Sequence, residues 1–112
     1  TTLFRSRTAL IERFRRRLAS PFLVYGIGGD FENYVRPLVD ALPVAALLDS
    51  STDKQGTFVD GRRVQAYAED VHGGLPILVS SIRFGEDIKR HLRALGIEEA
   101  RIVVLSDVYD PA

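Results

Sequence analysis

The sequence of 112 residues contains no cysteine, no tryptophan and no methionine, and it has only two histidines. Without cysteine the chain cannot form disulfides, bind zinc through thiolates or use a thiol as a nucleophile. His72 and His91 lie far apart, and neither belongs to a His-x-x-x-His pair. We therefore expect neither a metal site nor a disulfide scaffold.

Long apolar runs are also lacking, since none approaches the roughly 20 residues that cross a bilayer. The first residues are rich in arginine and lack the apolar region of a signal peptide, which predicts a cytoplasmic protein. Hydrophobic residues make up 46% of the chain and charged residues 27%, the balance of an ordinary globular domain. The length suits one domain, and a first residue that is Thr rather than Met is typical of a piece of a longer polypeptide.

Positive charge is concentrated at the start of the chain. Residues 1–20 carry six arginines and one glutamate, and the remaining residues sum to −5. An amphipathic helix is predicted over residues 3–18, ended by Ser20-Pro21, with apolar positions at Leu3, Phe4, Ile11, Phe14 and Leu18. We divide the chain into this basic helix (1–20) and a domain over 21–112. The helix either packs on the domain with a solvated basic face or contacts a partner.

Four short apolar runs, at residues 22–25, 44–48, 76–79 and 102–105, predict buried strands of a parallel sheet. Helices are predicted over 31–42, where Pro37 should kink the helix or shift its start, and over 82–95. A minor hairpin is expected around Asp60-Gly61 and a short helical turn at 66–71. The tail from Ser106 has too little pattern to predict a helix.

Alternating strands and helices predict right-handed βαβ units. The expected fold is a three-layer α/β domain with a four-stranded, mainly parallel sheet of order 2-1-3-4, plus the N-terminal helix. Ligands bind such a sheet beyond the carboxyl ends of its strands. Three polar segments should meet there, formed by Gly26, Gly28, Gly29 and Asp30, by Asp49 and Ser50, and by Ser80 and Ser81.

The glycines permit a tight turn that a ligand can approach closely. Asp49 lies 23 residues after Gly26, near the spacing at which a carboxylate binds ribose hydroxyls. The dinucleotide fingerprint is incomplete, however, because it requires glycine where this chain has Phe31. Asp30 would also repel a pyrophosphate.

A purely structural interpretation stays open for the same residues. The glycines then only make the turn, Asp30 caps the following helix, Asp49 ends its strand and the two serines cap a helix. Likewise, His72 is expected to be exposed in its loop, and His91 to pair with Asp87 four residues earlier. No catalytic set is assigned.

Several stretches in order resemble a known group of domains. They are Val24-Tyr25-Gly26-Ile27-Gly28, Leu48-Asp49-Ser50, Lys54-Gln55-Gly56-Thr57-Phe58, Gly61-Arg62-Arg63-Val64, Ile77-Leu78-Val79-Ser80-Ser81, Glu86-Asp87-Ile88 and Leu92-x-x-Leu95-Gly96-Ile97. The chain resembles the Rossmann-like domains attached to bacterial polysaccharide-biosynthesis enzymes, over about residues 20–106. Such domains occur beside sugar methyltransferases, glycosyltransferases, dehydratases and acyltransferases.

The resemblance implies a non-catalytic module that binds a nucleotide or nucleotide-sugar for a partner catalytic domain. It leaves the cofactor open between a nucleotide-sugar and NAD(P), with S-adenosylmethionine less favoured. Two alternatives remain: an interaction or oligomerisation domain with a vestigial pocket, and part of an oxidoreductase or methyltransferase. Nucleic acid and membrane are not expected partners.

Overall fold

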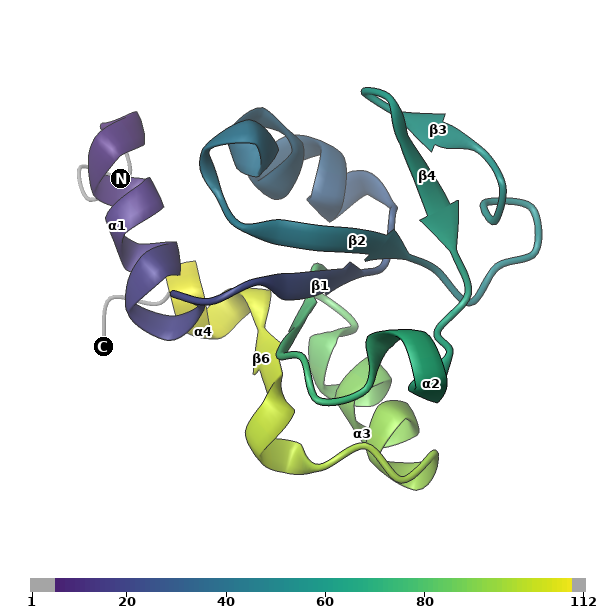
Figure 1. Ribbon diagram of the computed structural model, residues 1–112. Helices are drawn as coiled ribbons and strands as arrows, with labels where there is room; N and C mark the ends of the chain where they lie inside the picture. The colour runs from purple at the N-terminus through teal and green to yellow at the C-terminus, as the bar shows by residue number, and fades with distance from the viewer. Residues whose placement is uncertain (1–5, 110–112) are drawn as a thin grey trace.

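The computed structural model describes residues 6–109, and these form a twisted sheet covered by helices on both faces (Figure 1). Within these residues the sheet has six strands in the order β3-β4-β2-β1-β5-β6. All neighbouring pairs are parallel except β3 and β4, which form an antiparallel hairpin. The strands are β1 (Phe22–Tyr25), β2 (Val44–Leu48), β3 (Phe58–Val59), β4 (Arg62–Gln65), β5 (Ile77–Val79) and β6 (Ile102–Val104).

The predicted four-stranded sheet of order 2-1-3-4, one half of a doubly wound fold, is therefore wrong. The sheet is mixed and extends beyond β2, because β4 pairs with it through Leu47 and Val64 and through Leu48 and Gln65. The expected hairpin is present, and Asp60 (φ 50°) and Gly61 (φ 83°) form its turn. The sequence of β4 hid its place in the sheet, because only Val64 of its four residues is buried.

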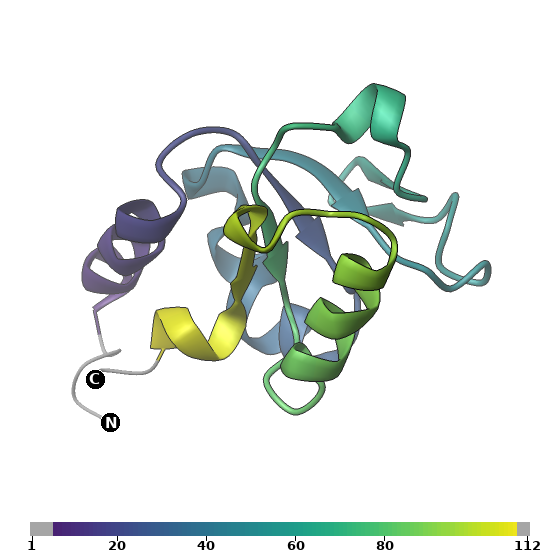
Figure 2. The same cartoon turned by 90° about the horizontal axis from the view of Figure 1, so that it is seen from below.

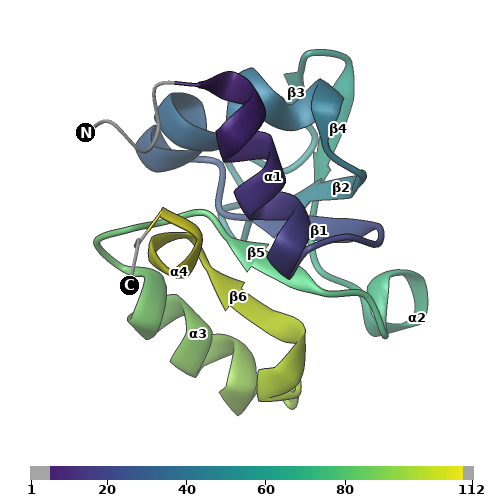
Figure 3. The same cartoon turned by 90° about the vertical axis from the view of Figure 1, so that its left-hand side faces the viewer.

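Helices form a layer on each face of the sheet. On one face lie α1 (Arg7–Arg17), the helical segments η2 (Phe31–Val35) and η3 (Arg36–Ala41), and α4 (Leu105–Tyr109). The other face is covered by α3 (Gly85–Ala94). Two short helical segments, α2 (Glu69–His72) and η4 (Glu99–Arg101), lie near the edge of this face (Figures 2 and 3). Side chains of β1 alternate between the two cores: Phe22 and Val24 face α1, whereas Leu23 and Tyr25 face α3.

The expected helix over 31–42 is divided between Val35 and Arg36, directly before Pro37. Proline has no N–H to donate to the carbonyl four residues earlier, so the chain leaves α-helical bonding there. The N–H of Arg36 donates instead to the carbonyl of Phe31, which closes the wider turn of η2. The tighter 3₁₀ turns of η3 follow, with proline in their first turn.

Helix α1 is part of the domain core. Phe14 is fully buried and Leu18 nearly so, and Ser6 caps the helix by accepting the N–H of Ala9 at 3.2 Å. Four of its arginines donate to carbonyls of the same chain, and the two shortest bonds run from Arg13 to Val108 at 2.7 Å and from Arg15 to Ala41 at 2.9 Å. The predicted positions Leu3 and Phe4 lie outside the described residues.

Two further predictions are wrong. The tail folds back as α4, because Leu105 and Val108 are buried in the same core as Phe14, a tertiary contact that local pattern does not reveal. His72 is only 4% exposed. Its Nδ1 accepts the N–H of Ala68 at 2.9 Å, and its Nε2 lies 3.1 Å from Oε1 of Gln65. The histidine thus stabilises the turn before α2.

Candidate ligand-binding site

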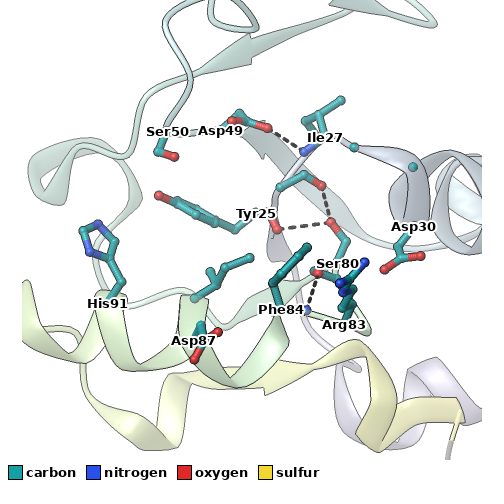
Figure 4. A pocket seen from close by; sticks show the side chains of 15 residues that line it. Tyr25, Ile27, Asp30, Asp49, Ser50, Ser80, Arg83, Phe84, Asp87 and His91 are labelled. Atoms are coloured by element: carbon teal, nitrogen blue, oxygen red, sulfur yellow. Dashed lines mark hydrogen bonds between the residues drawn. The ribbon is translucent and has the colours of Figure 1, made fainter.

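A pocket of about 780 Å³ lies beyond the carboxyl ends of β1, β2 and β5, between the glycine turn and α3 (Figure 4). This is within the range of small-molecule sites. All eight residues singled out from the sequence line it. Seven others join them: Tyr25, Ile27, Arg83, Phe84, Asp87, Ile88 and His91.

Asp49 holds the glycine turn in place. One carboxylate oxygen accepts the N–H of Ile27 at 2.7 Å, and the other accepts the N–H of Ser51 at 2.8 Å. Its own backbone is also tied, since its N–H donates to Gln65 and its carbonyl accepts from the side chain of Gln55. The residue expected to bind ribose is therefore first a clamp between the ends of β1 and β2.

Asp30 does not cap the helix that follows it, contrary to the structural interpretation of the sequence. No side-chain capping bond forms there. Its Oδ2 instead accepts the N–H of Ile82 at 2.7 Å, across the pocket edge in the loop after β5. Asp30 thus joins the two loops that border the pocket.

The two serines play different parts. Ser80 is 2% exposed, and its hydroxyl contacts the carbonyls of Tyr25 and Gly26, which fastens β5 to the start of the turn. Ser81 accepts the N–H of Phe84 at 3.0 Å and so shapes the turn before α3. In the structural interpretation both serines cap a helix, and only Ser81 comes close to this role.

The three glycines of the turn are not equivalent. Gly26 has φ +103°, a conformation that disfavours any other residue. At Gly28 and Gly29 a Cβ would meet no atom within 4 Å, so glycine is not needed there for backbone packing. These two positions border the open space of the pocket.

Helix α3 supplies the wall that the sequence reasoning missed. Phe84, Asp87, Ile88 and His91 line the pocket at helical spacings of three and four residues. Phe84 and Ile88 lie four residues apart, the spacing of one helix face, and Phe84 is 53% exposed. Gly85 lets α3 lie close to the sheet, because a Cβ there would collide with Val104. Asp87 pairs with Arg90 at 2.8 Å rather than with His91.

One end of the pocket holds hydroxyl groups and an imidazole. The hydroxyl of Tyr25 points toward Ser50, with His91 facing the same space (Figure 4). Burial raises the pKa of Tyr25, a hydrogen bond with Ser50 lowers it, and the charge of Asp49 raises it again. Together these effects raise the pKa of Tyr25 above its ordinary value, so the hydroxyl keeps its proton at neutral pH and can donate to a ligand.

No group of three or more residues positioned to hold a metal ion occurs between residues 6 and 109. Over the same range, none of the helices is long and apolar enough to pass through a bilayer.

Comparison with curated proteins yields no match. A family model described as C2185-like, N-terminal, matches residues 19–103. The match begins after α1, includes the glycine turn, the pocket residues and strands β1 to β5, and ends within β6. The chain belongs to the C2185-like N-terminal family.

Proposed function

We propose that this domain is a non-catalytic binding module for a nucleotide, a nucleotide-sugar or a related nucleoside, and that it serves a partner catalytic domain. The observation that carries the proposal is the pocket in which the glycine turn, Asp49, Ser50, Ser80 and Ser81 meet the face of α3. Its volume suits a ligand of this size. The resemblance noted in the sequence extends the proposal to sugar or polysaccharide biosynthesis.

The lining chemistry supports a ligand with both a flat apolar part and hydroxyls. Ile27, Phe84 and Ile88 offer apolar surface, and Tyr25 and Ser50 offer hydroxyls at one end. The carboxylates of Asp30 and Asp49 and the hydroxyl of Ser80 are engaged by backbone groups of this chain. Such groups hold a site in shape, which fits binding better than chemistry.

A thermal-shift screen tests the proposal. The panel contains nucleotide-sugars, NAD(H), NADP(H), S-adenosylmethionine, mononucleotides and the parent nucleosides. A ligand at a hundredfold excess over its Kd stabilises a protein by about 2.7 kcal/mol, a shift on the order of 10 °C for a domain of this size. If no member of the panel raises the melting temperature, the proposal is wrong.

A pair of variants at Gly28 locates the binding. Because a Cβ there meets no atom within 4 Å, Gly28→Ala and Gly28→Phe should both fold with unchanged or slightly higher stability. The alanine leaves most of the pocket open, whereas the phenylalanine occupies it. We expect the ligand-induced shift to persist in the first variant and to be lost in the second. Equal shifts in both would place the ligand elsewhere.

A further inference from the structure

The side chains around the pocket are unbalanced in charge. Three aspartates (Asp30, Asp49 and Asp87) and one arginine (Arg83) line it, together with His91. The aspartates and the arginine of the wall sum to −2, and to −1 when Arg90, which pairs with Asp87, is counted with them. A diphosphate would add two or more negative charges to this space, where field lines between low-dielectric walls strengthen repulsion.

Two of the carboxylates cannot turn away from a ligand at the glycine turn without losing bonds. Asp49 is fixed by the N–H groups of Ile27 and Ser51, and Asp30 is fixed by the N–H of Ile82. They stand on either side of the turn, where a phosphate would approach. The negative charge is therefore built into the turn.

Two N–H groups of the turn, which could otherwise donate to a phosphate, are already hydrogen-bonded within the chain. The N–H of Ile27 donates to Asp49, and the N–H of Gly26 donates to the carbonyl of Leu48 at 2.8 Å. Arg83 is the one cation with a permanent charge in the pocket wall, and its guanidinium lies 5.1 Å from the ring centre of Phe84. Arg83 lies on the same side of the pocket as Asp30 (Figure 4), so the negative charge of Asp30 partly offsets the positive charge of the guanidinium.

We infer that the pocket takes the nucleoside end of its ligand, with a neutral or positively charged substituent at the glycine turn, and that it selects against phosphorylated forms. This inference rests on the proposed function and narrows its ligand class. The hydroxyls of Tyr25 and Ser50 suit sugar hydroxyls, and the apolar surface of Ile27 and Ile88 suits a base. The fixed carboxylates suit an ammonium or sulfonium group.

The test compares the affinities of ligands that share a base and differ in the number of phosphates. The affinities are measured by isothermal titration calorimetry in low salt with EDTA. Adenosine, AMP and ADP form one series, uridine, UMP and UDP form another, and S-adenosylmethionine is the positively charged nucleoside. We expect affinity to fall with each added phosphate and S-adenosylmethionine to bind at least as tightly as adenosine. Without a divalent cation, the phosphates keep their full charge.

The variant Asp30→Asn tests whether Asp30 causes the weaker binding of phosphorylated ligands. In Asp30→Asn the amide oxygen can still accept the N–H of Ile82, so the loop contact is kept while the charge is removed. We expect the ratio of nucleotide Kd to nucleoside Kd to fall roughly tenfold. The matched control is Asp40→Asn, which removes the same charge from an exposed site on η3 that does not line the pocket and should leave the ratio unchanged.

The outcomes separate the two proposals. Tighter binding of the phosphorylated members, or an unchanged ratio in Asp30→Asn, would overturn the charge-based inference and leave the binding function standing. If neither nucleosides nor nucleotides bind, the proposed function falls and the inference falls with it. Falling affinity with each added phosphate together with a reduced ratio in Asp30→Asn would support both.

Discussion

At the scale of single residues, Asp49 was predicted as a ligand contact, and the structure gives it a role in holding the backbone of the glycine turn. Its spacing from the glycine turn suggested contact with ribose. In the structure both of its oxygens accept backbone N–H bonds, from Ile27 and Ser51. Carboxylate bonds to backbone N–H groups are charge-assisted and stronger than neutral ones. Each oxygen still has a second lone pair for a ligand.

The clamp predicts a cost in the absence of any ligand. In Asp49→Asn the amide nitrogen would face a backbone N–H, so one bond is lost and one donor is left unpaired. We expect the free energy of unfolding to fall by about 1–3 kcal/mol, measured by urea denaturation. Asp53→Asn, at an exposed position beyond the pocket, should have little effect. An unchanged urea midpoint in Asp49→Asn would contradict a stabilising role for this carboxylate in the absence of a ligand.

At the scale of elements, the contact between α4 and η2 gives a pH-dependent contribution to stability. The hydroxyl of Tyr109 donates to the carbonyl of Tyr34 at 2.9 Å, and the two rings meet edge to face. Burial, with a smaller effect of Tyr34, raises the pKa of Tyr109 to about 12. The folded state therefore holds this proton more tightly than the unfolded state, whose pKa is near 10.

The sign follows from proton linkage. The stabilisation is complete below pH 10 and is lost as the pH rises from 10 toward 12, because only the unfolded chain releases the proton in that interval. In Tyr109→Phe the fall in unfolding free energy over this interval should be shallower. Below pH 10 this variant should be less stable by about 1 kcal/mol, the usual contribution of one hydrogen bond.

The control for the titration is Tyr34→Phe. The bond from Tyr109 goes to the backbone carbonyl of Tyr34, so this variant keeps it and should retain most of the alkaline loss. Identical slopes for wild type and Tyr109→Phe, in urea melts at several pH values, would contradict the assignment.

Helix α1 lies before the region matched by the family model, yet it contributes to the same core. Phe14 has no exposed surface and packs edge to face on Tyr109, with ring centres 6.0 Å apart. We expect Phe14→Ala to lower the unfolding free energy by about 3–5 kcal/mol, through lost burial and a remaining cavity. Arg16→Ala, on the exposed face of α1, should stay within about 0.5 kcal/mol of wild type. A loss of similar size in both variants would refute a core role for Phe14.

At the scale of the whole molecule, the sequence predicted the parts that depend on local pattern. The buried runs of β1, β2, β5 and β6 were visible as continuous apolar segments, and the turn at Asp60-Gly61 was visible from its residues. The place of β4 in the sheet was not, since its pairing with β2 is long-range and only Val64 marks it as buried. For the same reason α4 was missed, because it is stabilised by packing against distant residues.

The candidate site divides in the same way. The residues at strand ends were predictable, because in a parallel arrangement successive carboxyl ends meet at one edge. Their hydrogen-bond partners were not, and neither was the wall formed by α3. Arg83 and His91 have no local signal that separates a pocket residue from an exposed helix residue. Their role depends on how far α3 approaches the sheet, which Gly85 sets through its contact with Val104.

The central position of β1 has a consequence for motion. Its four residues are all buried and it is paired on both sides, with β2 and with β5, so its amide protons can exchange with solvent only when the sheet itself opens. The glycine turn follows directly on this strand, and Asp49 and Ser80 fasten it to the ends of β2 and β5. We therefore expect the floor of the pocket to open only together with the central strands of the sheet.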